Sequence, residues 1–157
     1  PQADGIDEVC FLISTNPGEP VRPLGEVASG GELSRIMLAI KTVLAEKDEM
    51  GTLIFDEIDV GISGRTAQKV SEKMAVIARH HQVICITHLA QIAAMADHHF
   101  VIEKYVQNQN TFTSIQELSE EETVRELARI LGGARITRTV LENAREMKEL
   151  AIRTKKY

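Results

Sequence analysis

Two acidic residues and one histidine follow apolar segments, and residues of these types can carry out hydrolytic chemistry. Asp56 and Glu57 follow the run Thr52 to Phe55, and His88 follows the run Val83 to Thr87. One carboxylate can hold Mg²⁺ through its water shell, and a second can orient or deprotonate an attacking water. A neutral histidine can hydrogen-bond a phosphate oxygen or a water. Taken singly, an acidic turn and a helix-capping histidine are the simpler alternatives.

A second group, Ser29-Gly30-Gly31-Glu32, has the residue types of a helix start that binds an anion. Glycines let a ligand approach the backbone closely, and the free N–H groups and dipole of a helix start favour negative charge. Ser29 can donate its hydroxyl to a phosphate oxygen. The same residues form a capping box, with Ser29 as N-cap and Glu32 three residues later, so an ordinary capped helix is the alternative.

The elements around these residues alternate between strand and helix. Apolar patterns predict strands at 9–14, 52–55 and 83–87, and helices at 31–47, 65–80 and 89–95. Short continuous apolar strands are typical of an α/β fold with a mostly parallel sheet covered by helices on both faces. The carboxyl ends of parallel strands meet at one edge, so we expect Asp56, Glu57 and His88 to share that edge.

The C-terminal part of the sequence has a different pattern. Strands at 100–106 and 111–118, joined by a polar turn, predict a β-hairpin. Ser119 and Glu122 form a second capping box, which opens a helix ending at Gly132-Gly133, and a last helix covers about 139–153. Because no repeat or linker interrupts the chain, we expect residues 1–157 to form one domain.

Composition narrows the classes of protein that fit. The chain is 43% apolar, as in a soluble globular domain, and no apolar run is long enough to span a membrane. Its net charge of −5 argues against tight DNA binding by this chain alone. Cys10 and Cys85 lie in apolar runs, which favours buried reduced thiols and a cytosolic setting. The remaining histidines are expected at the surface or in turns: His80, His81, His98 and His99.

Three motifs in a fixed order carry a resemblance to a known family. The Ser-Gly-Gly-Glu helix start, the strand ending in Asp-Glu and the strand ending in His resemble the signature motif, Walker B motif and switch histidine of ABC-type ATPase heads. The flanking residues are similar to a bacterial SMC-like branch that acts in DNA repair, in which a long coiled coil splits the head. They are Leu12 to Glu19, Val27 to Arg35, Phe55 to Gly64 and Thr87 to Ala93.

The resemblance implies roles for the motif residues. Asp56 would help to hold Mg²⁺, Glu57 would be the general base or water-orienting residue, and His88 would sense the γ-phosphate of ATP. The signature residues would contact the γ-phosphate of ATP bound to a second head, so that two heads sandwich two nucleotides. These residues are Ser29, Gly30, Gly31 and Glu32.

The resemblance also implies partners and a location. The partners would be the N-terminal head lobe of the same protein, a second head in a homodimer, and DNA bound through the full-length assembly. The protein would be cytoplasmic and nucleoid-associated, with no membrane partner. Its function would be ATP hydrolysis in DNA double-strand break repair and recombination.

Two positions depart from the family pattern. Ala28 stands where the signature usually begins with Leu, which leaves Ser29 and the glycines intact. Ser63 stands where the loop after the Walker B motif usually ends in Asp, and it is the candidate for nucleotide contact at that place. Because serine carries no charge, the charged contact that Asp would make across the dimer is not expected from this position. Asp59 is the alternative residue for that contact.

The sequence contains no Gly-x-x-x-x-Gly-Lys-Ser/Thr loop, and it begins with Pro1 rather than Met. The resemblance places that loop in the N-terminal half of the protein. We therefore expect a C-terminal lobe that is part of a longer protein and is inactive as an ATPase by itself. Two alternatives stay open: the head of another ABC-type ATPase, such as a transporter subunit, and a non-enzymatic module that uses the fold only to dimerise.

Overall fold

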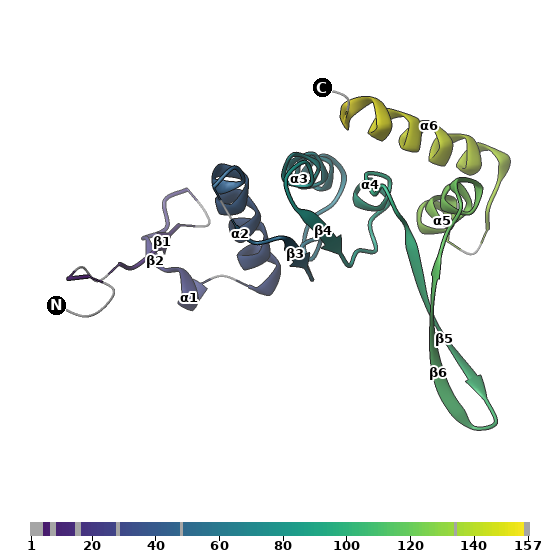
Figure 1. The fold of residues 1–157 in the computed structure, drawn as a ribbon, viewed down its shortest axis with the longest axis horizontal. Coiled ribbons are helices and arrows are strands. Elements are labelled where there is room, and N and C mark those ends of the chain that lie inside the picture. The colour runs from purple at the N-terminus through teal and green to yellow at the C-terminus, as the bar shows by residue number, and fades with distance from the viewer. Residues whose placement is uncertain are drawn as a thin grey trace.

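The computed structural model describes residues 5–6, 9–14, 17–27, 29–47, 49–133 and 135–155. The elements follow one another across an elongated molecule, from β1 and β2 near one end to α5 and α6 near the other (Figure 1). Their bounds in chain order are β1 Leu12–Ile13, β2 Arg22–Pro23, α1 Leu24–Val27, α2 Gly30–Leu44, β3 Thr52–Phe55, α3 Gly64–Ile77, β4 Gln82–Cys85, α4 Ala90–Ala93, β5 Phe100–Gln107, β6 Asn110–Glu117, α5 Glu120–Gly132 and α6 Arg138–Lys155.

The strands of the described residues form three two-stranded sheets. β3 and β4 are parallel, with Thr52 opposite Gln82 and Phe55 opposite Cys85. The other two pairs, β1 with β2 and β5 with β6, are antiparallel. The chain thus mixes helices and strands as expected, but a mostly parallel sheet is not confirmed.

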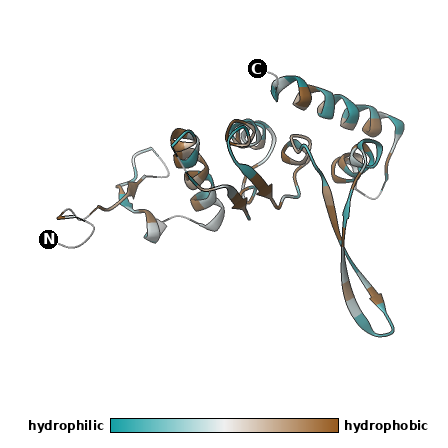
Figure 2. Cartoon of the chain, in the orientation of Figure 1, coloured by the Kyte–Doolittle hydropathy of each residue, from teal (hydrophilic) through white to brown (hydrophobic). Residues whose placement is uncertain are grey.

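The β3–β4 sheet is covered on one face only by the described residues. That face contributes to a core shared with α2 and α3, which contains Leu38, Leu53, Phe55, Met74 and Ile77. On the other face Ile54, Ile84 and Ile86 are 68%, 44% and 53% exposed, although both strands are strongly apolar (Figure 2). The prediction of a sheet covered by helices on both faces is therefore wrong for this chain, because α2 and α3 pack on the same side.

The C-terminal part agrees with the sequence patterns. β5 and β6 pair along their whole length, and the hairpin extends away from the helices (Figure 1). Its turn places Asn108 and Gln109 at φ 50° and 63°, the left-handed conformation that tight hairpins require. α5 begins with the predicted capping box of Ser119 and Glu122. No helix of the described part could cross a membrane, since none is both long and apolar enough.

Other expectations are wrong or fall outside the described residues. Instead of a buried strand at 9–14, the structure has the two-residue β1, and Cys10 is exposed rather than buried. His81 lies in the turn between α3 and β4, as one of its two expected settings had it, but it is buried and not at the surface. Its Nδ1 is 2.6 Å from the Met50 carbonyl oxygen and its Nε2 is 3.1 Å from that of Ala45. Residues outside the described ranges include Pro1, Thr15, Asn16 and Ala28.

Candidate functional site

The parallel register of β3 and β4 brings the acidic motif and the histidine to one sheet edge. Phe55 lies opposite Cys85, and the Ile86 amide donates to the Phe55 carbonyl at 3.0 Å. Asp56 follows β3 directly, and His88 stands shortly after the end of β4. Both side chains are exposed there, so this edge carries a carboxylate pair and an imidazole accessible to a ligand.

Asp59, in the loop after β3, is hydrogen-bonded to the residues that follow β4. Its side chain is 3% exposed, and its Oδ2 accepts hydrogen bonds from Thr87 Oγ1 at 2.6 Å and from the His88 amide at 2.9 Å. The His88 Nδ1 also lies 3.0 Å from the same oxygen. Burial would raise the pKa of the Asp59 carboxyl, but the bonds from Thr87 and His88 outweigh it and hold this pKa below its usual value. Asp59 is therefore an internal anion, not an exposed contact across a dimer.

Helix α2 holds the loop after β3 from the other side. Ser34 Oγ donates to the Asp56 carbonyl at 2.9 Å. Arg35 Nη1 donates to the carbonyls of Ile58 at 3.1 Å and Val60 at 2.9 Å. Alternate carbonyls of the loop 56–60 are thus bound by two neighbouring side chains of one helix. The start of α2 and this acidic loop consequently form one connected unit.

Glu57 bends toward the start of α2. Its backbone has φ 57°, a left-handed conformation that costs a non-glycine residue on the order of 1–3 kcal/mol. A Cβ on Gly30 would lie 2.6 Å from Glu57 Oε2, and a Cβ on Gly31 would lie 2.9 Å from the Glu57 carbonyl oxygen. Both glycines therefore permit close approach within the chain itself, so the acidic motif and the signature turn are in contact.

Ser29 and Glu32 form the capping box that the sequence predicts. Glu32 Oε2 accepts from the Ser29 amide at 2.9 Å and from Ser29 Oγ at 3.0 Å, and the Glu32 amide donates to Ser29 Oγ at 3.4 Å. The bonds from Ser29 lower the pKa of the Glu32 carboxyl. In this state the Ser29 hydroxyl points to Glu32, and it would have to rotate to reach a phosphate.

Asp56 and Ser63 are the remaining predicted ligands. Asp56 is exposed, and its Oδ1 accepts from the Glu57 amide at 2.9 Å. Proteins often hold Mg²⁺ through one carboxylate, with water and substrate phosphates as the other ligands, and Asp56 fits that donor set. No cluster of three or more potential metal ligands occurs among the described residues. Ser63 is the exposed N-cap of α3 and makes no side-chain capping bond.

Three contributors were not identified from the sequence: Ser34, Arg35 and Thr87. Ser34 and Arg35 lie just after the Ser-Gly-Gly-Glu turn, between apolar residues of α2. A polar pair at this place in a helix was the one sequence feature that could have indicated their contacts with another segment. Thr87 directly precedes His88, where a hydroxyl at a strand end can bond a buried carboxylate. Each acts through contacts with distant segments, which a local pattern does not reveal.

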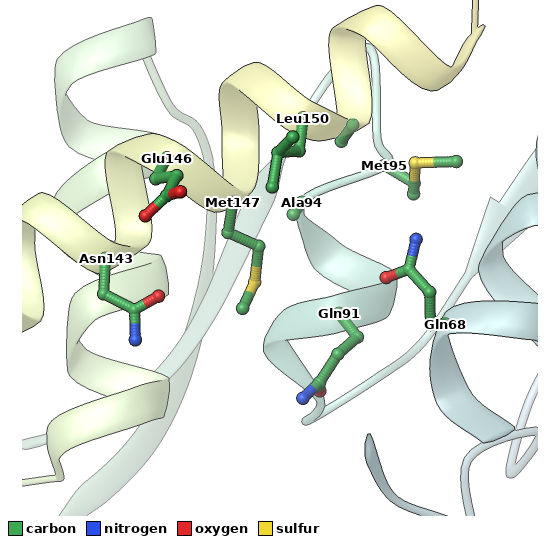
Figure 3. A pocket seen from close by; sticks show the side chains of 9 residues that line it. Gln68, Gln91, Ala94, Met95, Asn143, Glu146, Met147 and Leu150 are labelled. Carbon is green, nitrogen blue, oxygen red and sulfur yellow. The ribbon is translucent and has the colours of Figure 1, made fainter. Parts of the chain in front are cut away.

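A cavity of about 350 Å³ lies apart from this edge, between α3, α4 and α6 (Figure 3). Amide side chains from all three helices face it, namely Gln68, Gln91 and Asn143. None of the predicted site residues lines it. The residues that the sequence predicts to carry out hydrolytic chemistry are therefore at the open sheet edge and not in this cavity.

Comparison with solved structures finds a similar fold. A chain solved in work on ATP-driven dimerization and DNA stimulated activation of SMC ATPases has a TM-score of 0.50 and 23% identity, covering 76% of this chain and 79% of that one. The likeness concerns the fold. No family model matches the chain.

Comparison with curated proteins gives a closer similarity, to DNA repair protein RecN. RecN of Treponema pallidum is 54% identical over 143 residues, 91% of this chain and 25% of that protein. RecN of Bacillus subtilis is 47% identical over 151 residues, 96% of this chain and 26% of that protein. The resemblance to a bacterial DNA repair family is thus confirmed, as similarity to RecN over nearly the whole chain. The chain spans about a quarter of the length of these relatives.

Proposed function

We propose that this chain is the C-terminal lobe of an SMC-like ATPase head that acts in DNA double-strand break repair and recombination. One observation carries the proposal: the loop 56–60 connects the signature turn to the acidic motif and to the histidine. Glu57 lies against Gly30 on one side, and Asp59 binds Thr87 and His88 on the other. The RecN relatives, which are named as DNA repair proteins, support the cellular role.

The exposed residues at the sheet edge would act on ATP held against it. Asp56 would hold Mg²⁺, which when bound neutralises phosphate charge, and Glu57 would orient or deprotonate the attacking water. His88 would meet the γ-phosphate through its ring. The exposure of all three side chains at one edge suits a nucleotide that arrives on another polypeptide segment.

The signature turn would serve the nucleotide of a second head. Ser29 and Gly30 are exposed at the start of α2, where a helix favours an anion, and Ser63 is exposed at the start of α3. Dimerisation of two such heads is supported by the SMC structure, which comes from work on ATP-driven dimerization and DNA stimulated activation. DNA would be bound by the full-length assembly, because this chain has a net charge of −5.

The exposed face of the β3–β4 sheet suits the N-terminal head lobe of the same protein. Ile54, Ile84 and Ile86 form an apolar surface of the kind that marks a protein–protein contact. That lobe would also bring the phosphate-binding loop, so we expect the isolated chain to show no Mg²⁺-dependent ATP hydrolysis. The assembled protein would be cytoplasmic and associated with the nucleoid.

The test is Glu57→Gln in the complete protein that carries this chain. Losing a general base should slow hydrolysis by about a hundredfold or more, whereas ATP binding should persist. Glu72→Gln is the matched control, because Glu72 lies on α3 and bonds Lys69 and Gln68 instead of the site. Unchanged turnover in Glu57→Gln would remove the assigned base. ATP binding and dimerisation without hydrolysis in the unmodified protein would favour the non-enzymatic alternative.

A further inference from the structure

The ring of His88 rests on the buried carboxylate of Asp59, with Nδ1 and Oδ2 3.0 Å apart. We propose that Asp59 is a positioning residue: it fixes the proton of His88 on Nδ1 and turns Nε2 toward the nucleotide. A lone pair on Nδ1 would face the carboxylate oxygen and be repelled, whereas an Nδ1–H is attracted. The inference rests on the proposed role of His88 in ATP hydrolysis.

The carboxylate of Asp59 is buried, and specific donors compensate its charge. A buried carboxylate is costly unless several donors compensate it. Here the compensating donors come from two adjacent residues, the hydroxyl of Thr87 and the amide of His88. The His88 side chain itself is 74% exposed. An exposed ring rotates freely in water unless a contact such as the one with Asp59 holds it.

The position of Asp59 is fixed by its neighbours in turn. Arg35 Nη1 binds the carbonyls of Ile58 and Val60, the residues on either side of Asp59. Thr87 Oγ1 accepts from the Leu89 amide at 3.1 Å, which directs its own proton to Asp59. A continuous series of contacts therefore leads from α2 through Asp59 to the ring of His88.

For the reaction, Asp59 would determine the direction of the hydrogen bond that His88 Nε2 makes, whatever the charge of the ring. With Nδ1–H facing Asp59, Nε2 is the ring atom left to face solvent and ligand. A neutral ring then accepts a hydrogen bond at Nε2 from water, and a charged ring donates one to a phosphate oxygen. In both cases Asp59 sets where that bond points. Removing Asp59 should leave the ring free to rotate and without a fixed tautomer.

A double-mutant cycle on ATP hydrolysis tests the inference in the complete protein. We expect Asp59→Asn to lower kcat by about ten- to a hundredfold with little change in KM, as for residues that orient a reacting group. In the His88→Ala background the same substitution should cause no further loss, because its effect passes through the ring. If the double mutant loses kcat by the product of the two single-mutant losses, the proposal is overturned. Asp97→Asn makes the same chemical change at an exposed carboxylate that pairs with Lys155, and should behave as wild type.

Nitrogen NMR of the complete protein that carries this chain, with ¹⁵N-labelled histidine, gives a second readout that does not depend on hydrolysis. We expect Nδ1 of His88 to carry a proton in the wild type, and Asp59→Asn to populate both tautomers. The His88→Ala variant assigns the resonance. A wild-type neutral ring protonated on Nε2 alone would overturn the proposal, even if Asp59→Asn does not fold. If His88→Ala instead hydrolyses ATP normally, the proposed function of His88 fails while the tautomer result still stands.

Discussion

The carboxylate of Glu57 lies against Gly30, so that a Cβ at position 30 would be 2.6 Å from Glu57 Oε2. At position 31 a Cβ would lie 2.9 Å from the Glu57 carbonyl oxygen and 3.1 Å from Val60 Cβ. The first neighbour is the end of an exposed, flexible side chain, which can move. The second is backbone held by Arg35 through the adjacent carbonyls, which cannot move without cost.

The two glycine substitutions should therefore separate function from stability. Gly30→Ala should leave the free energy of unfolding within about 1 kcal/mol of wild type, since alanine favours the helix, but should displace Glu57 and slow hydrolysis. Gly31→Ala should lower the free energy of unfolding by roughly 1–3 kcal/mol, as overpacking does. Urea denaturation of both variants measures this difference, and equal losses of stability would contradict the geometry.

The two capping boxes provide a matched pair for testing whether the signature serine has a role beyond capping. Ser29 and Ser119 make the same three bonds, with Oγ to glutamate Oε2 at 3.0 Å and 2.7 Å. Ser29→Ala and Ser119→Ala should each lower stability by about 1 kcal/mol. Only Ser29→Ala should also reduce ATP hydrolysis by the complete protein. If the two variants reduce hydrolysis equally, Ser29 is only a helix cap.

The apolar face of the β3–β4 sheet should be the contact with the N-terminal lobe. Ile54→Lys places a charge on that face, where Ile54 is 68% exposed. It should improve the solubility of this chain and weaken its association with a separately expressed N-terminal lobe. Val76→Lys on α3 is the control at a position already 40% exposed. Titration calorimetry measures the affinity, and equal affinities for both variants would place the contact elsewhere.

Local patterns in the sequence predicted much of the fold. A continuous apolar run indicated β3, and two strand-like segments on either side of a polar turn indicated the hairpin. The serine–glutamate spacing indicated both capped helix starts. The packing of α2 was less predictable. Its apolar stripe includes Leu33 and Met37, which are exposed, while Leu38 is buried. Periodicity identifies an apolar face but not whether this chain or a partner covers it.

The site was only partly predictable for a similar reason. Parallel pairing explains why Asp56 and His88 share an edge, and that followed from the order of the elements. The role of Asp59 did not follow, because its bond to Thr87 joins residues 28 positions apart. Likewise, the contact of Glu57 with Gly30 depends on a left-handed backbone at Glu57, which residue type does not indicate.

The central claim is that the signature turn and the acidic motif of one chain serve different ATP sites. Complete proteins carrying Ser29→Arg or Glu57→Gln should each hydrolyse ATP poorly alone. Ser29→Arg should do so because bulk and charge at the start of α2 oppose ATP-driven head pairing at both sites, whereas a mixed dimer carries that substitution at one site only. A mixed dimer of the two would combine an intact Glu57 from one subunit with an intact Ser29 from the other at one of its sites.

Measuring ATP hydrolysis by such mixed dimers, co-expressed with two different tags and purified through both, tests this most directly. The account predicts that they hydrolyse ATP well above either parent, because each contains one complete site. Purified mixed dimers as inactive as both parents would contradict it, because the two motifs would then have to act within the same chain.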